Sequence, residues 1–177
     1  MTQQELFIKK IFDDEATPVK TFAKGEFVVR QGQVEQSLYL IVSGAVRVIH
    51  VTEFEEQTIR FGYPGSMITS LSSFITGKPS EFYIEALRKT TLRIVSRTKL
   101  FEIIHEDTQN QSIYIKLLEG LVVQQMEREI DLLTESPLKR LQRVLERSAN
   151  QFQEIPLKYI ASYLRMTPET LSRIRNS

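Results

Sequence analysis

Cysteine is missing from the 177-residue sequence, which excludes disulfide bonds, cysteine-ligated zinc or iron–sulfur centres and cysteine nucleophiles. No apolar run approaches the roughly 18 residues that a membrane-spanning helix needs. The opening stretch, MTQQELFIKKIF, lacks the basic-then-apolar layout of a secretory signal. We therefore expect a cytoplasmic protein with no membrane contact, and the absence of cysteine agrees with a reducing compartment.

Catalytic and metal-binding motifs are also absent. The seven glycines stand singly, so they form no phosphate-binding loop. Neither His50 nor His105 has a second histidine or a nucleophile at a suitable spacing. Each histidine is better explained as a structural or exposed side chain than as a haem ligand. We expect no enzyme activity, no metal site and no cofactor.

Charge is unevenly distributed along the chain. The whole sequence has a net charge of +1, but residues 137–177 carry eight Lys or Arg against three acidic residues, a net charge of +5. The remainder carries −4. A small basic unit on an acidic body suggests a polyanionic partner for that unit. A basic face that is simply solvated would give the same count, so this alternative stays open.

Residues 1–106 have the pattern of short strands that follow a brief helix over residues 5–12. Stretches rich in Val, Ile, Tyr and Phe alternate with single glycines, as in GEFVVRQGQ, SLYLIVSGAVRVIHV and SEFYIEALRKTTLRIVSR. Short strands at close spacing predict an antiparallel sandwich or small barrel. The segment SMITSLSSFITGK predicts a turn of helix or an ordered loop among these strands.

Residues 107–135 predict one long helix. Apolar side chains recur at helical spacing within about one third of the helical wheel. They are Ile115, Leu118, Val122, Met126, Ile130 and Leu133. Tyr114, Leu117 and Leu121 widen the apolar surface, so the helix needs two partners. We favour the sheet domain and a second copy of the helix over a purely intramolecular core helix.

Residues 136–177 predict three short helices, the last of them capped by Thr167 with Pro168 at its first position. The last two helices are joined by a tight turn, with the small Ala161 where they would cross, which is the layout of a helix-turn-helix. In that motif the second helix enters the major groove of DNA. An ordinary helical hairpin has the same spacing and is the alternative.

The polar side chains that face outward from this unit suit contacts to DNA. Arg173 can donate two hydrogen bonds to guanine, and Glu169 can accept one from the amino group of cytosine. Further side chains of the unit can bond to bases or contact phosphates. The predicted DNA-binding set is Lys158, Arg165, Thr167, Glu169, Thr170, Ser172, Arg173 and Asn176.

The segment IPLKYIASYLRMTPETLSRI resembles the helix-turn-helix of the Crp/Fnr family of bacterial transcription regulators. KGEFVVRQGQ followed by LYLIVSGAVRV resembles strands of that family's cyclic-nucleotide-binding β-roll. The resemblance implies an α+β fold with an antiparallel β-roll over 1–106, a dimerisation helix over 107–135 and a helix-turn-helix domain over 136–177. It also implies that Gly25, Gly32 and Gly44 lie at turns that need positive φ or close packing.

The same resemblance implies a homodimer that binds double-stranded DNA, with RNA polymerase as a further partner if the protein activates transcription. Glu169 and Arg173 match the base-contacting residues of the family. Pro168 stands where an arginine is common, which should change the preferred sequence, and Arg165 takes a turn position where glycine is common. No sequence for a β-wing follows the final helix, so we expect that wing to be absent or truncated.

A resemblance also defines the predicted effector pocket, which consists of Ser70, Leu71, Ser72, Ser73, Ser80, Glu81 and Phe82. It places the ribose-binding glutamate of the family at Ser70, the phosphate-binding arginine at Ser80 and a small hydroxyl residue at Glu81. A buried phosphate needs a charge-assisted partner, so we expect no tight binding of cyclic AMP or cyclic GMP. The serine hydroxyls favour an unknown neutral or cationic effector, and a filled, vestigial pocket is the alternative.

Two functions follow from the sequence. The main hypothesis is a homodimeric, sequence-specific transcription regulator controlled by an effector other than cyclic AMP. The alternative is a ligand-sensing or protein-interaction module with a degenerate helix-turn-helix that does not read DNA. Pro168 and Arg165 favour the alternative, whereas the basic C-terminal unit and the pair Glu169 and Arg173 favour the regulator.

Overall fold

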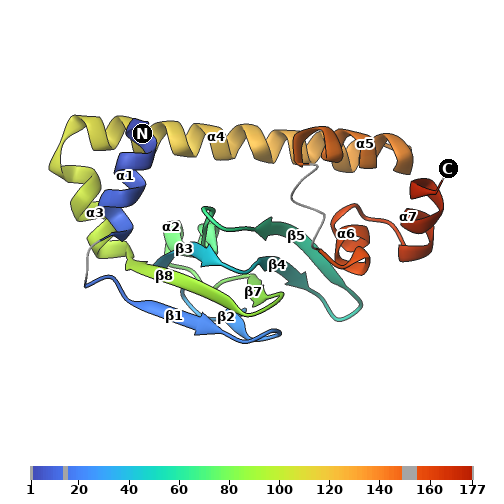
Figure 1. Cartoon of the computed structure of the whole chain (residues 1–177), viewed down its shortest axis with the longest axis horizontal. Coiled ribbons are helices and arrows are strands. Elements are labelled where there is room, and N and C mark those ends of the chain that lie inside the picture. The colour runs from blue at the N-terminus through green and yellow to red at the C-terminus, as the bar shows by residue number, and fades with distance from the viewer. Residues whose placement is uncertain (1, 14–15, 149–154, 177) are drawn as a thin grey trace.

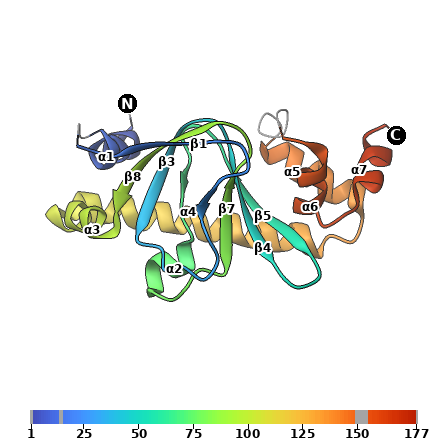
Figure 2. The same ribbon diagram turned by 90° about the horizontal axis from the view of Figure 1, so that it is seen from below.

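The computed structural model describes residues 2–13, 16–148 and 155–176. A two-sheet unit and three short C-terminal helices lie along one long helix, α4, that runs the length of the molecule (Figure 1). The two sheets and the last two C-terminal helices lie on the same side of α4 in Figure 1, and the view from below in Figure 2 shows the sheets in front of that helix. The α+β fold with an N-terminal β-roll and C-terminal helices is therefore confirmed.

The β-roll consists of two four-stranded antiparallel sheets with strand orders β1-β8-β3-β6 and β2-β7-β4-β5. Its strands are β1 Val19–Phe22, β2 Phe27–Val29, β3 Ser37–Ser43, β4 Val46–Val51, β5 Glu56–Gly62, β6 Met67–Ile68, β7 Phe82–Ala86 and β8 Thr90–Ser96. The short helix α2, Leu71–Thr76, interrupts the strands where the sequence predicts a helical turn or loop.

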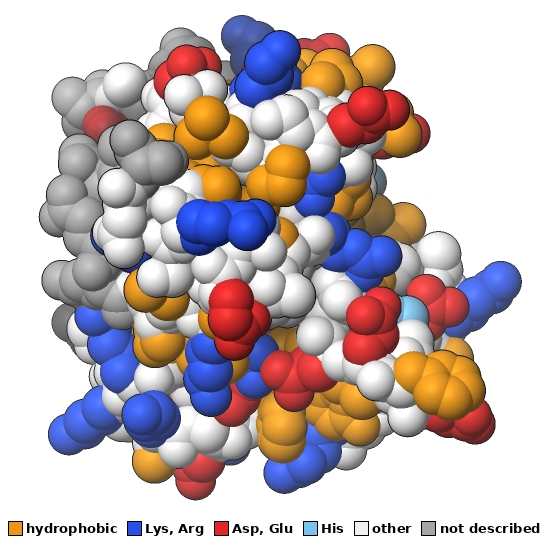
Figure 3. Space-filling model, turned by 90° about the vertical axis from the view of Figure 1, so that its right-hand side faces the viewer, with side chains coloured by type: hydrophobic (Ala, Val, Ile, Leu, Met, Phe, Trp, Pro, Cys, Tyr) orange, Lys and Arg blue, Asp and Glu red, His pale blue; other side chains and the backbone are white. Residues whose placement is uncertain are grey.

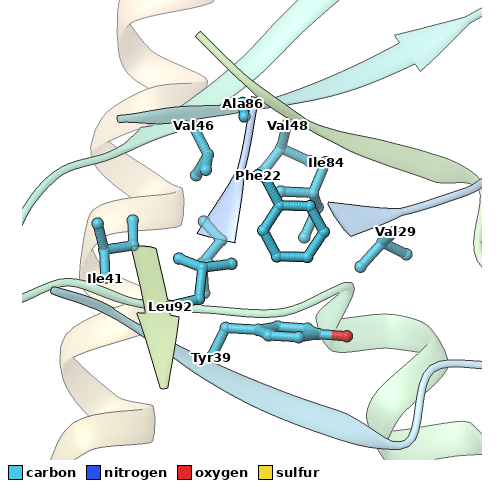
Figure 4. Packing of buried hydrophobic residues seen from close by; sticks show 10 residues of the cluster. Phe22, Val29, Tyr39, Ile41, Val46, Val48, Ile84, Ala86 and Leu92 are labelled. Atoms are coloured by element: carbon cyan, nitrogen blue, oxygen red, sulfur yellow. The ribbon is translucent and has the colours of Figure 1, made fainter. Parts of the chain in front are cut away.

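The core of the β-roll lies between the two sheets. Phe22, Ile41 and Leu92 come from one sheet and meet Val46 and Ile84 of the other (Figure 4). These side chains are at most 5% exposed, and burial of one such side chain stabilises the fold by about 1.5–3 kcal/mol. The period-2 alternation of the strands therefore gives each sheet one apolar face toward the other.

The predicted turn glycines are confirmed, because Gly25, Gly32 and Gly44 all have positive φ. Gly44, between β3 and β4, has a second constraint. A Cβ built on it would lie 2.4 Å from Thr90 Oγ1 and 2.6 Å from the carbonyl oxygen of Lys89. This β-turn therefore excludes larger residues for both conformational and steric reasons.

A helical layer covers one end of the β-roll. Helix α1, Gln3–Phe12, begins two residues before its predicted start because Thr2 and Glu5 form a capping box. Helix α3, Arg97–Glu106, is not part of the sequence prediction, although Ser96 caps it and its buried residues recur at helical spacing. Both helices pack in one apolar cluster with the N-terminal half of α4.

The remaining helices are α4 Thr108–Leu133, α5 Pro137–Ser148, α6 Leu157–Tyr163 and α7 Pro168–Arg175. Helix α4 is a single helix of 26 residues, as its periodicity predicts. Helices α5 to α7 share a third apolar cluster with the β-roll residues Ala45 and Leu87. Among the described helices, none combines the length and hydropathy needed to cross a bilayer.

Candidate nucleic-acid interface

Helices α6 and α7 form a tight helix-turn-helix. Ala161 in α6 and Leu164, the C-cap of that helix, are buried against Leu171 of α7. None of the three residues is more than 1% exposed. The predicted cap of α7 is confirmed, since Thr167 Oγ1 accepts a hydrogen bond from the Thr170 amide at 3.2 Å. Arg165, with φ of 55°, is the non-glycine residue that adopts the left-handed conformation in the turn.

A left-handed arginine in the turn confirms that this position suits glycine. Such a conformation costs a non-glycine residue of the order of 1 kcal/mol. The packing of α6 on α7 must offset this free-energy cost. The backbone amide of Met166 also bonds to the Ala161 carbonyl across the turn. The turn is therefore well formed despite the departure from glycine.

The predicted reading face of α7 is exposed. Glu169, Ser172, Arg173 and Asn176 all point away from the buried Leu171. Thr167 is exposed as well, whereas Thr170 is half-buried and its hydroxyl bonds to Thr167 Oγ1 at 3.1 Å. Helix α7 lies at the end of the molecule toward which the C-terminus of α4 points (Figure 1).

Two predicted phosphate contacts flank this face. Lys158 is exposed, with its ammonium 4.7 Å from the ring centre of Tyr159. Arg165 is exposed too, but its guanidinium lies 3.5 Å from the carboxylate of Glu55 in the β4–β5 hairpin. Figure 3, which views this end of the molecule, shows Lys and Arg side chains with acidic ones between them. All eight residues of the predicted DNA-binding set thus lie on helices α6 and α7 and the turn and cap beside them, at one end of the folded molecule.

Three arginines that contribute to the +5 charge already bind groups of the protein itself. Arg140 donates to the carbonyl of Thr134 at 2.7 Å and to that of Leu164 at 2.7 Å. Arg143 and Arg147 both bind the carboxylate of Asp131. The charge count therefore overstates the positive charge that this unit offers to a polyanion.

Two buried charged residues of α4 have no counterpart in the sequence prediction. Arg128 is 8% exposed and Asp131 is fully buried. Arg128 donates to the carbonyl of Tyr163 and stacks 3.8 Å from the centre of its ring, and burial lowers the pKa of its guanidinium. In sequence both residues look like a solvated helix face, because their partners lie 12 or more positions away.

Helix α6 also contacts the edge of the β-roll. Ser162 Oγ accepts a hydrogen bond from the amide of Thr58 in the edge strand β5 at 2.9 Å. Arg47 of β4 is 4% exposed and forms an ion pair with Glu85 of β7. Its guanidinium carbon lies 4.0 Å from the ring centre of Tyr159 in α6. The helix-turn-helix is therefore fixed to the β-roll by polar contacts as well as by the shared apolar cluster.

Helix α4 exposes an apolar face over its C-terminal half. Val122, Met126, Ile130 and Leu133 are 51% to 74% exposed, while Leu118 is half-buried. Tyr114 and Leu117, on a neighbouring flank, pack against the cluster formed with α1 and α3. The flank of α4 with Tyr114 and Leu117 is therefore covered by α1 and α3, whereas the flank around Met126 is exposed.

The predicted effector pocket divides into a buried and an exposed part. Ser70, Ser73 and Ser80 are at most 2% exposed, whereas Leu71, Ser72 and Glu81 are exposed and Phe82 is half-buried. The buried hydroxyls bond to the protein itself. The Oγ atoms of Ser70 and Ser80 lie 2.7 Å apart, Ser80 donates to the Phe82 carbonyl, and Ser73 donates to the Lys78 carbonyl.

A buried carboxylate stands beside these serines and is missing from the sequence prediction. Glu35 is 6% exposed, and its oxygens accept hydrogen bonds from the amides of Gln36 and Ser37 and from the hydroxyl of Tyr39. Its own amide donates to Ser73 Oγ at 2.9 Å. Burial raises the pKa of the Glu35 carboxyl and that of the Tyr39 hydroxyl. The buried charged residue that the structure places next to these serines is therefore an acid and not a cation.

Comparison with known proteins agrees with this architecture. The model of the cyclic nucleotide-binding domain matches residues 19–107. The chain is 27% identical over 164 residues to the nitrogen fixation regulation protein FixK of Rhizobium meliloti, covering 88% of the chain and 72% of FixK. It is 27% identical over 183 residues to the transcriptional activator protein FnrA of Stutzerimonas stutzeri, covering 92% of the chain and 70% of FnrA.

A different kind of relative matches about half of the chain. The potassium channel KAT3 of rice is 30% identical over 92 residues, which cover 52% of the chain and 18% of the channel.

Among solved structures, FixK2 of Bradyrhizobium japonicum has a TM-score of 0.77 at 21% identity, covering 91% of the chain and 83% of FixK2. A double mutant of CooA from Carboxydothermus hydrogenoformans has a TM-score of 0.74 at 18% identity, and the match covers 96% of the chain and 82% of CooA.

These matches define the class of the protein as one that contains a domain of the cyclic nucleotide-binding type. The chain belongs to the cyclic nucleotide-binding domain family. It is homologous to FixK and FnrA, and its structural neighbours are Crp/Fnr family regulators. The relatives that match along most of the chain are regulators, not enzymes.

Proposed function

We propose that this protein is a sequence-specific DNA-binding transcription regulator that acts as a homodimer. The observation that carries the proposal is the exposed polar face of α7, presented by a well-packed helix-turn-helix at the end of the molecule toward which α4 points. The likeness to FixK and FnrA, both named as regulators, supports the same function. The division into 1–106, 107–135 and 136–177 is part of this proposal.

The exposed face of α4 supports the dimer. Val122, Met126, Ile130 and Leu133 form an apolar stripe along one side of a long helix, and such a stripe is typical of a helix that pairs with another. Parallel pairing about a two-fold axis would place both α7 helices at the same end of the dimer. Two half-sites one turn of DNA apart, roughly 34 Å, would then be within reach.

Each predicted contact has a role in this proposal. Arg173 reads a guanine and Glu169 a cytosine, both from the exposed face of α7. Lys158 and Arg165 meet phosphates and position the helix without reading sequence. The proposed effector is not cyclic AMP, because the buried serines are saturated by internal hydrogen bonds and Ser80 supplies no cation.

The test is selection of bound fragments from a random DNA pool, with Arg173→Ala and Arg175→Ala beside the wild type. Both substitutions remove one positive charge from α7, but only the first lies on the predicted reading face. We expect a two-fold symmetric motif for the wild type and for Arg175→Ala. Arg173→Ala should relax one position in each half-site and lose about 1–3 kcal/mol of discrimination there.

The alternative function is an interaction module whose helix-turn-helix does not read DNA. One observation favours it, namely that Arg165 is already paired with Glu55 and three further arginines bind other groups of the protein. The salt dependence of DNA binding separates the two functions, because each phosphate contact releases counterions. A shallow salt dependence with no enriched motif would support the interaction module.

A further inference from the structure

The junction between α4 and α5 is held by charged groups. Asp131, near the end of α4, has a fully buried side chain. One of its oxygens accepts from Arg143 Nε at 3.0 Å and from Arg147 Nη1 at 3.2 Å, and the other binds Arg147 Nη2. The two arginines are four residues apart on α5, so both reach the same carboxylate from one face of that helix.

Two further arginines extend the junction to the helix-turn-helix. Arg140 of α5 bonds to the carbonyl of Thr134 after α4 and to those of Leu164 and Arg165 in the turn of the helix-turn-helix. Arg128 of α4 bonds to the carbonyl of Tyr163 at the end of α6. The orientation of α6 and α7 relative to α4 therefore depends on these directional polar contacts, in addition to the packing of the three short helices on the β-roll.

Apolar packing plays little part at this junction. Among the described residues, the apolar cluster that unites α5, α6 and α7 has no member from α4. Hydrophobic contact is non-directional and tolerates sliding, whereas a buried carboxylate held by two arginines has a fixed geometry. Loss of one partner from a buried pair also leaves an uncompensated charge.

We infer that Asp131 is a positioning residue that sets the distance between the two reading helices, and so the spacing of half-sites that the dimer accepts. The inference rests on the proposed function. Helix α4 would lie beside the two-fold axis, and α7 lies at the far side of the junction. A small rotation at Asp131 would therefore change the distance between the two α7 helices. It would leave the side chains that each α7 presents to DNA unchanged.

The test uses the full chain with Asp131→Asn, which keeps the shape of the side chain and removes its charge. The matched control is Glu127→Gln. Glu127 is one turn earlier on α4 and pairs with the same Arg147 at 3.3 Å, but its side chain is 42% exposed. Arg147→Gln is a second test variant that retains the bond between Asp131 and Arg143.

Binding is measured on a set of DNA duplexes that share the selected half-sites and differ by one or two base pairs in the spacer. Each added base pair turns one half-site by roughly 34° relative to the other. We expect the wild type and Glu127→Gln to lose about tenfold or more in affinity per base pair, and Asp131→Asn and Arg147→Gln to lose about threefold or less. The base preferences within each half-site should stay the same in all four proteins.

A second measurement does not depend on DNA. The chain has no cysteine, so Asn176→Cys gives a single spin label on each α7 of a dimer. The distance distribution between the two labels should be narrow in the wild-type background and broad with Asp131→Asn. Folded Asp131→Asn with unchanged spacing selectivity and an unchanged distribution would overturn the inference and leave the proposed function intact. A wild type that enriches no DNA site would instead overturn the proposed function.

Discussion

The buried pair Ser70 and Ser80 shows how single residues decide whether the β-roll keeps a ligand site. Ser80 occupies the position that the resemblance assigns to a phosphate-binding arginine, and it is 2% exposed. Its hydroxyl bonds to Ser70 Oγ at 2.7 Å and to the backbone of Phe82. These contacts close a hydrogen-bond network that an incoming phosphate would have to break without gaining a cation in return.

Substitution of this pair tests whether the network is structural. Ser80→Ala removes the hydrogen bond that the buried Ser70 hydroxyl makes and should lower the free energy of unfolding by about 1–3 kcal/mol. The double variant Ser70→Ala/Ser80→Ala should cost little more than Ser80→Ala, because it leaves no buried hydroxyl there. Urea unfolding followed by circular dichroism measures both. Full additivity of the two substitutions would show that the hydroxyls do not act as a pair.

At the scale of elements, α4 has to serve two sets of partners. Its Tyr114 and Leu117 pack against α1 and α3, and its Arg128 and Asp131 bind α5 and α6. What remains uncovered is the stripe around Met126, which is 60% exposed. We attribute this stripe to a second copy of the chain.

Met126→Glu tests the role of this stripe. A carboxylate placed there would have to be buried at the dimer interface, so we expect a monomer at concentrations where the wild type is a dimer. The control is Gln124→Glu, which adds the same charge about 160° around the helix. Sedimentation velocity gives the oligomeric state. A dimer that persists with Met126→Glu would place the interface elsewhere.

At the scale of the whole molecule, the β-roll and the helix-turn-helix are in contact. The β4–β5 hairpin meets the turn of the helix-turn-helix through Glu55 and Arg165, and the edge strand bonds to Ser162. A carboxylate at Glu55 thus stands where a DNA phosphate would pair with Arg165. The β-roll therefore places a negative charge directly beside the proposed DNA contact.

Removal of that carboxylate should strengthen DNA binding. The ion pair is exposed and of modest strength, so we expect Glu55→Gln to raise affinity by about two- to fivefold, with a salt dependence steeper by about one counterion. Glu53→Gln, on the same hairpin, is the control for long-range charge. A fluorescence-anisotropy titration at several salt concentrations gives both values. Equal effects of the two substitutions would mean that Arg165 does not exchange Glu55 for phosphate.

The sequence by itself determined most of the elements and their faces, with helix α3 as an exception. Stretches rich in Val, Ile, Tyr and Phe between single glycines predicted the strands, helical spacing predicted α4, and the cap at Thr167 with Pro168 predicted the start of α7. The positive φ of Gly44 and the glycine-like turn position of Arg165 were implied by the family resemblance, and the backbone angles confirm both. These features depend on residues close in sequence, whose spacing carries the information.

The tertiary structure alone decided which polar groups are available for function. In sequence, Arg140, Arg143 and Arg147 read as positive charge for a polyanion, and Asp131 reads as a solvated residue. The burial of Asp131 and the pairing of these arginines depend on where α4 ends relative to α5, which no local pattern encodes. In the same way the serines of the predicted pocket became a closed network only when α2 met the loop before β7. Long-range contacts set these pairings, because a charged group is costly to bury until its partner is brought beside it.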